Sequence, residues 1–153
     1  RLSRAQLPRK RTIFLMFGVL AISLIFTSVY SAIVQWLGAD KLSPPVVESD
    51  ILFNGMAVIL TFQALAFITP FSEELFFRGF VFRGLISKVG PYGAMMISAA
   101  IFSGFHLSLG ALIPIFITGF LLAWLYWRTG SLWASVGAHA GQNALALVAI
   151  GLV

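Results

Sequence analysis

The residues able to do chemistry lie in three short windows of otherwise apolar sequence. They are Glu73, Glu74 and Arg78 in the first window, Phe102 and His106 in the second, and His139 and Asn143 in the third. The windows hold both histidines of the chain and two of its five acidic residues. A charged side chain at the centre of a transmembrane helix costs about 2.5–3.5 kcal/mol on insertion scales, so such residues indicate function.

Helical spacing separates the two adjacent glutamates. Glu74 and Arg78 are four residues apart and face the same side of a helix, where they are able to pair. Glu73 is rotated by about 100° from Glu74 and lacks that partner. One carboxylate is therefore expected to be structural and the other to be free for chemistry.

Each window also has a purely structural interpretation. The first could be a buried ion pair that holds helices together. His106 could be a hydrogen-bonded packing residue, and His139 with Asn143 could link two helices. The presence of all three windows in one apolar chain favours a single site.

Several kinds of proteolytic chemistry lack their residues here. Neither histidine belongs to an HExxH zinc motif, and Asp40 and Asp50 both lie in a polar loop rather than in a membrane segment. Ser103 and Ser108 flank His106 without a Gly-x-Ser-x-Gly elbow, and cysteine is absent. Among these options, a glutamate that activates water remains.

Composition predicts the elements that must position these residues. Of 153 residues 59% are hydrophobic and 10% are charged, which excludes an ordinary soluble domain and predicts an all-α, polytopic transmembrane bundle. About five membrane segments are expected, at residues 12–37, 51–69, 92–109, 112–127 and 132–153. We divide the chain into a basic arm, anchor helix and loop (1–50) and a core that carries the site (51–153).

Two prolines and their neighbours predict interruptions. Pro70 should kink or restart a helix, so residues 51–88 could form one kinked helix or two shorter ones. Gly90-Pro91 predicts a turn, and Gly110 is expected between the third and fourth segments. Glu73 and His106 are 17 and 16 residues from Gly90, so antiparallel arms would bring them to nearly the same height.

The charge distribution predicts the orientation. The chain has 10 Lys and Arg against 5 Asp and Glu, and many of the cations precede the first apolar run. This pattern is typical of a cytoplasmic N-terminus and argues against a nucleic-acid partner. Because the sequence starts at Arg1, we expect a fragment or a processed form.

The three windows resemble one protein family. Residues 73–78 (EELFFR), 102–106 (FSGFH) and 139–143 (HAGQN) are similar to the EExxxR, FxxxH and HxxxN motifs of the CAAX prenyl endopeptidase and bacteriocin-processing (CPBP) family of intramembrane proteases. The resemblance covers residues 51–153, and many family members have additional N-terminal helices.

The resemblance implies roles for the site residues. Glu73 would be the general base that polarises a water held jointly with His106, and His139 and Asn143 would stabilise the oxyanion. Arg78, paired with Glu74, would position the acidic helix, and Phe102 would pack against that pair or the substrate. We favour a metal-independent reaction without a cofactor. A divalent metal such as zinc, bound by Glu73, His106 and His139, is the alternative.

The predicted function is an intramembrane endopeptidase in a bacterial cell membrane. Its expected partners are the lipid bilayer and a peptide or lipid-modified protein substrate; the oligomeric state is left open. The alternatives are a non-catalytic scaffold or bacteriocin-immunity protein that retains the motifs, and an ion- or proton-translocating bundle.

Overall fold

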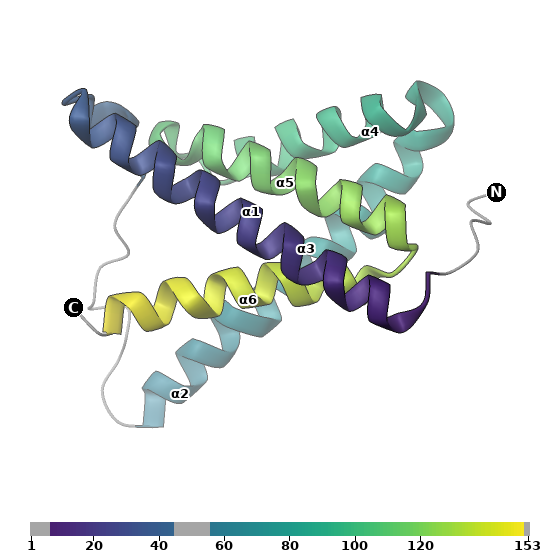
Figure 1. The fold of residues 1–153 in the computed structure, drawn as a ribbon, viewed down its shortest axis with the longest axis horizontal. Helices are drawn as coiled ribbons and strands as arrows, with labels where there is room; N and C mark the ends of the chain where they lie inside the picture. Colours follow the sequence, from purple (N-terminus) through teal and green to yellow (C-terminus); the bar gives the residue numbers. More distant parts are fainter. Residues whose placement is uncertain (1–6, 45–55, 152–153) are drawn as a thin grey trace.

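The computed structural model describes residues 7–44 and 56–151, and in these ranges every regular element is a helix (Figure 1). The elements are α1 (Arg9–Trp36), η1 (Asp40–Leu42), α2 (Met56–Gln63), η3 (Ala64–Ile68), α3 (Thr69–Glu74), η4 (Leu75–Phe82), α4 (Arg83–Phe105), α5 (Leu109–Thr129) and α6 (Leu132–Gly151). The all-α prediction is therefore confirmed.

Three of the described helical stretches are long and apolar enough to cross a membrane. They are Arg9–Trp36, Ala57–Phe105 and Leu109–Thr129. The helix α6 is 20 residues long but falls outside this set. The expected count of about five segments is not confirmed, and the starts predicted at residue 51 and the end at 153 lie outside the described residues.

The segment around Pro70 forms one continuous helical run rather than two helices. From α2 to the start of α4 the backbone stays helical, with π-helical turns at η3 and η4 on either side of α3. Pro70 lies in the first turn of α3, directly after the wider π-helical turn η3. The helix therefore continues through Pro70 although its nitrogen has no N–H to donate. Of the two possibilities predicted for residues 51–88, one kinked helix or two shorter ones, the described part of this range forms the first.

Two turns fold the remaining helices back on one another. Gly90 has a φ of 74°, which breaks the helical path before Pro91 as predicted. The prediction for the next turn was wrong, because α4 ends at Phe105 and Leu107 has a φ of 50°. His106 is therefore the C-cap of α4 rather than a residue inside a helix, and Gly110 belongs to the first turn of α5.

Helix α5 lies at the centre of the bundle and contributes to both apolar cores. One core joins α1, α5 and α6 through Val19, Leu122, Leu125, Ala134 and Ala138. The other joins η4, α4 and α5 through Phe82, Ala94, Met95, Ala123 and Tyr126. The two cores place the site-bearing segments on either side of α5.

Helix α1 is packed into the bundle. Glycines of α6 allow its close approach: a methyl group added at Gly137 would come within 2.7 Å of Met16 Sδ, and one at Gly141 within 3.1 Å of Leu20 Cδ2. These two glycines thus admit a neighbouring helix, and that neighbour is α1.

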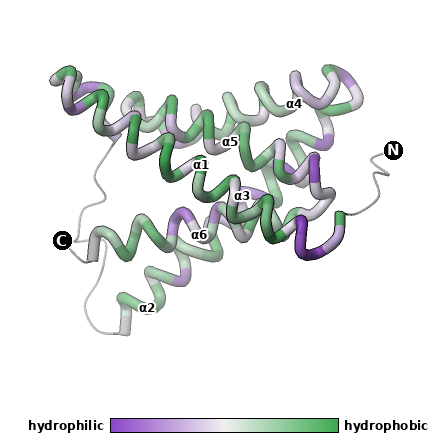
Figure 2. The backbone as a smooth tube through the Cα atoms, in the orientation of Figure 1, coloured by the Kyte–Doolittle hydropathy of each residue, from purple (hydrophilic) through white to green (hydrophobic). Residues whose placement is uncertain are grey.

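The helices consist of hydrophobic residues along most of their length (Figure 2), and many of these residues are exposed on the outside of the bundle. On α1, for example, Phe14, Ile25 and Trp36 are exposed. A helix that is apolar on both its packed and its outer faces is suited to lipid rather than to water.

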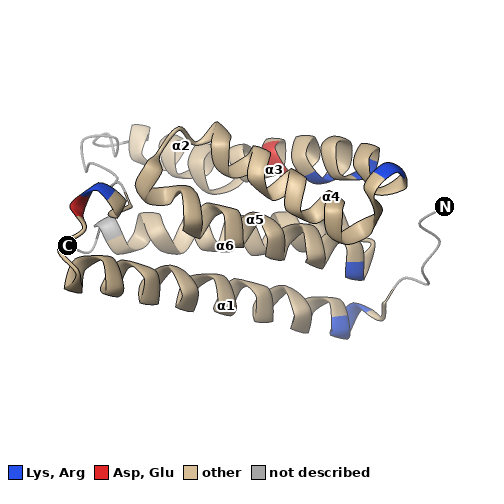
Figure 3. Cartoon of the chain, turned by 90° about the horizontal axis from the view of Figure 1, so that it is seen from above, with Lys and Arg blue, Asp and Glu red and all other residues tan. Residues whose placement is uncertain are grey.

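Most of the Lys and Arg residues in the described ranges lie at one end of the bundle (Figure 3). The start of α1, the bend of α4 at Gly90 and the end of α5 lie at that end, whereas η1 lies at the opposite end. A cavity lined by Arg9 and by residues 129–133 shows that the start of α1 adjoins the α5–α6 turn. The clustering of Lys and Arg at this end agrees with the prediction that the cations mark one side of the membrane. The cytoplasmic location of that side stays a prediction.

Gly110 provides a test of the packing between α5 and the segment after η1. A methyl group at this position would overlap the backbone carbonyl of Ser43. We expect Gly110→Ala to lower stability by about 1–3 kcal/mol, the usual cost of overpacking, measured by thermal unfolding in detergent. Gly104→Ala is the matched control because nothing lies within 4 Å of its added methyl. Equal melting temperatures for the two variants would contradict this packing.

Candidate functional site

The centre of the site is a buried carboxylate with two cationic or proton-donating partners. Arg78 Nη1 donates to Glu74 Oε1 at 2.5 Å, and His139 Nδ1 lies 3.0 Å from the same oxygen. Both side chains of the Glu74–Arg78 pair are 0% exposed. The predicted pair is confirmed, and its second partner comes from a helix 65 residues further along the chain.

Arg78 also connects the pair to the central helix. Its Nη2 donates to the carbonyl oxygen of Gly119 at 3.0 Å. A side chain at position 119 would collide with the ring of Phe102, since an added methyl would lie 2.9 Å from Phe102 Cδ1. Glycine at this point lets α5 present a backbone acceptor to Arg78 while Phe102 remains packed beside it.

Glu73 occupies a different environment from Glu74. Its Oε2 lies 3.6 Å from His139 Nε2, and 26% of its side chain is exposed. His139 thus lies between the two carboxylates, with one ring nitrogen towards each. Because a carboxylate only accepts hydrogen bonds, Nδ1 must donate to Glu74, and Nε2 is left facing Glu73. The structure therefore separates one buried glutamate from one accessible glutamate.

Phe102 holds three of the site residues together. The guanidinium carbon of Arg78 lies 4.6 Å from the ring centroid of Phe102, a cation–π distance. The rings of His106 and His139 pack edge-to-face on Phe102, with centroids 4.9 and 5.7 Å away. Phe102 thus contacts the Glu74–Arg78 pair, one of the two partners expected for it, and it also lines the larger cavity.

His106 is oriented by the end of its own helix. Its Nδ1 lies 2.8 Å from the carbonyl oxygen of Phe102, which must accept the hydrogen bond. In neutral His106 the proton is therefore on Nδ1, and Nε2 carries the lone pair. The early end of α4 exposes this ring instead of burying it among helix side chains.

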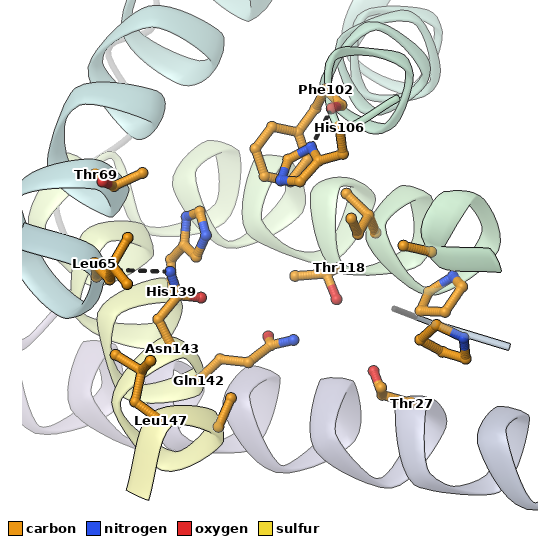
Figure 4. Close-up of a pocket in the computed structure, with 15 residues that line it drawn as sticks. Thr27, Leu65, Thr69, Phe102, His106, Thr118, His139, Gln142, Asn143 and Leu147 are labelled. Atoms are coloured by element: carbon orange, nitrogen blue, oxygen red, sulfur yellow. Dashed lines mark hydrogen bonds between the residues drawn. The ribbon is translucent and has the colours of Figure 1, made fainter. Parts of the chain in front are cut away.

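Two cavities meet at His106. The larger, of about 470 Å³, is lined by His106, His139, Gln142, Asn143 and mostly apolar residues, and Figure 4 shows these side chains around it. The smaller, of about 320 Å³, is lined by Ser72, Glu73, Phe76, Phe77, Phe105 and His106. Glu73 and His106 thus share a cavity, in agreement with the similar heights expected from their distances to Gly90.

The carboxamide of Asn143 is partly engaged by the backbone. Its Nδ2 donates to the carbonyl oxygen of Leu65 at 3.0 Å. Pro70, five residues after Leu65, has no N–H to donate in the i→i+5 pattern of a π-helical turn. Asn143 supplies a donor to that carbonyl, and its second N–H is not used in this bond.

Sequence reasoning missed the polar residues of α1 and their partners. Ser23 is buried and bonds both Thr118 Oγ1, at 2.6 Å, and Gln142 Oε1, at 2.8 Å. Thr27 lines the larger cavity one turn away. The only available signal was that Ser23 and Thr27 are four residues apart in an apolar helix.

The proposed metal ligands do not form a compact donor set. Within residues 7–44 and 56–151, no group of three or more His, Cys, Asp or Glu side chains could hold a metal ion. In the observed arrangement His139 is directed at the two glutamates, and His106 bonds its own helix through Nδ1. Glu73, His106 and His139 in this geometry therefore do not fit a three-ligand zinc site.

Comparison with known proteins identifies the family. Residues 55–145 match the family described as Type II CAAX prenyl endopeptidase Rce1-like, and this range contains all seven predicted site residues. The chain belongs to this family. The resemblance seen in the three motifs is thus confirmed, and α1, with Ser23 and Thr27, lies outside the matched range.

Two bacterial relatives share part of the chain. It is 33% identical over 92 residues to YdiL of Bacillus subtilis (strain 168), named as a candidate membrane peptidase; the match covers 60% of this chain and 38% of YdiL. It is 30% identical over 106 residues to the UPF0177 protein YxdF of Lactococcus lactis subsp. lactis (strain IL1403), covering 69% and 58%. The matches therefore span less than two thirds of the length of either relative. No solved structure matches.

Removal of Arg78 tests the buried pair. We expect Arg78→Met to destabilise the protein by about 3–5 kcal/mol, because it leaves the Glu74 carboxylate buried without its main partner. Denaturant unfolding in detergent measures this loss. Arg83→Met, one turn further on and exposed, should change stability little. The double variant Glu74→Gln/Arg78→Met should recover part of the loss, and a further loss instead would contradict the pairing.

Proposed function

We propose that the chain is an intramembrane endopeptidase of the CAAX-protease type that hydrolyses membrane-associated peptide or prenylated substrates. Membership of the Rce1-like family supports a membrane peptidase. The observation that carries the proposal is the shared cavity of Glu73 and His106, beside a second glutamate that is fully buried. An accessible carboxylate and an imidazole in one cavity have the groups needed to activate water.

In this proposal Glu73 is the general base. It accepts a proton from a water that His106 Nε2 helps to orient, and the resulting hydroxide attacks the scissile carbonyl carbon. The proton then passes to the leaving amine, so that the products are an acid and an amine. Support comes from the free lone pair of His106 Nε2 and from the partly exposed Glu73 carboxylate.

His139 and Asn143 are proposed to stabilise the oxyanion. Both line the larger cavity, and each has a nitrogen left over from its structural bond: Nε2 of His139, which is a donor in the imidazolium form of the ring, and the second N–H of Asn143 Nδ2. One donor of this kind typically contributes 10²–10³ in rate. Glu74, Arg78 and Phe102 act through them as positioning residues.

The proposed setting is a multi-pass protein of a bacterial membrane with the cationic end in the cytoplasm. Its support is the three helices of sufficient length and apolarity, the gathering of Lys and Arg at one end, and the two bacterial relatives.

Replacement of the accessible carboxylate tests the chemistry. We expect Glu73→Gln to lower turnover by about 10²–10⁴, the usual contribution of a general base, without changing insertion or stability. Mass spectrometry of a short peptide carrying a C-terminal farnesylcysteine, and of the same peptide unmodified, measures cleavage. Asp40→Asn, an exposed acid in η1, is the control and should retain activity. Cleavage by Glu73→Gln at the wild-type rate would contradict the role of Glu73 as the general base, whereas no cleavage by the wild-type protein would favour the scaffold alternative.

Chelation tests the metal alternative. Because the three candidate ligands do not fit a metal site as arranged, we expect turnover to survive prolonged dialysis against a chelator that strips zinc. Elemental analysis of the dialysed protein confirms that the metal content is negligible. Loss of activity on dialysis and its return with zinc would show that the proposed metal-independent reaction is wrong.

A further inference from the structure

The wall of the larger cavity formed by α1 and α6 carries polar groups that the proposed chemistry does not use. Thr27 of α1, Thr118 of α5 and Gln142 of α6 line this wall. Ser23, one turn before Thr27 on α1, bonds Thr118 and Gln142. Figure 4 shows the side chain of Gln142 extending from α6 towards Thr118 and the α1 side of the cavity. Most of the remaining lining residues are apolar.

The hydrogen bonds of Ser23 fix the orientation of the Gln142 carboxamide. Ser23 donates its single hydroxyl proton to Gln142 Oε1 at 2.8 Å. Thr118 must then be the donor in the 2.6 Å contact between the two hydroxyls. This chain of donors holds the Gln142 oxygen on Ser23 and leaves the Nε2 amide group for the cavity. No partner for Nε2 is found within the described residues.

Thr27 adds a second unpaired group to the same wall. Its Oγ1 is buried and has no hydrogen-bond partner in the described part of the chain. An orphaned hydroxyl in an apolar environment costs about 1–3 kcal/mol. Because the Thr27 oxygen has almost no accessible surface, the group that the wall offers to a ligand is the N–H donor of Gln142.

We propose that this wall, with Gln142 at its centre, binds the backbone of a peptide substrate next to the scissile bond; the inference rests on the proposed peptidase function. A peptide unwound for cleavage inside a membrane exposes bare C=O and N–H groups that require partners. Gln142 Nε2 donates to a substrate carbonyl. An apolar lipid chain would leave this amide group unsatisfied.

Helix geometry places the contacted carbonyl close to the cleavage point. Gln142 is three residues after His139, so the two side chains differ in height by about 4.5 Å along α6. An extended peptide advances about 3.3 Å per residue. Gln142 should therefore bond the carbonyl one or two residues from the scissile bond.

Ester substitution in the peptide tests the contact. Glu73→Gln protein, which keeps the peptide intact, is titrated with fluorescent versions of the farnesylated and the unmodified peptide, each with single amides replaced by esters. An ester carbonyl is a weaker acceptor, so the ester near the cleavage site should weaken binding several-fold. Addition of Gln142→Met should weaken binding of the all-amide peptide about three- to tenfold, as for the loss of one hydrogen bond, and abolish the effect of that ester.

Controls separate this role from a structural one. Gln35→Met, an exposed glutamine of α1, should leave every affinity unchanged. Ser23→Ala should weaken binding, with no further loss in the Ser23→Ala/Gln142→Met double variant. An ester profile that the Gln142→Met substitution leaves unchanged, or no peptide binding at all, would overturn the proposal.

A parallel cleavage assay with Glu73 intact keeps the two proposals apart. Binding that depends on Gln142, with no cleavage, would overturn the hydrolysis and support the backbone site. Cleavage with binding that is independent of Gln142 would overturn the backbone site alone.

Discussion

The site depends on one carboxylate, Glu74, that is buried in an apolar bundle. Such a group is tolerated only when charged or proton-donating partners surround it, and here Arg78 and His139 both bond Oε1. This requirement fixes α3, η4 and α6 together, and Arg78 extends the network to α5 through Gly119. The second nitrogen of His139 is then directed at Glu73. Glu74 thus positions the accessible Glu73 through the ring of His139.

The helix interruptions serve the same arrangement. The π-helical turn before Pro70 leaves a carbonyl at Leu65 to which Asn143 donates, so a break in one helix positions a side chain of another. The end of α4 at Phe105 brings the His106 ring to the meeting point of two cavities. In an apolar surrounding an unpaired polar group is costly, which is why structural and chemical groups are interleaved.

Short-range features of the site could be predicted from the sequence, and long-range ones could not. The spacing of Glu74 and Arg78 and the Gly90 turn follow from helical geometry and backbone sterics. The contact of His139 with both glutamates joins elements 65 residues apart, and no local pattern encodes it. The predicted end of α4 lies too far along the chain because Leu107 and Leu109 continue its apolar character past Phe105, and no local signal such as glycine marks the positive φ of Leu107. The role of α1 was missed because Ser23 and Thr27 are isolated hydroxyls outside the motifs.

The central claim is that His139 lies between Glu73 and Glu74, and that of these two glutamates only Glu73 lines the smaller cavity, which it shares with His106. Solid-state NMR of ¹⁵N-histidine, ¹³C-glutamate protein in bilayers measures it directly. The chain has two histidines, so a His106→Gln sample assigns the His139 signals. We predict short ¹⁵N–¹³C contacts from Nδ1 to the Glu74 carboxylate and from Nε2 to the Glu73 carboxylate, with the second lost in Glu73→Gln. A His139 ring without contact to either carboxylate would contradict the account.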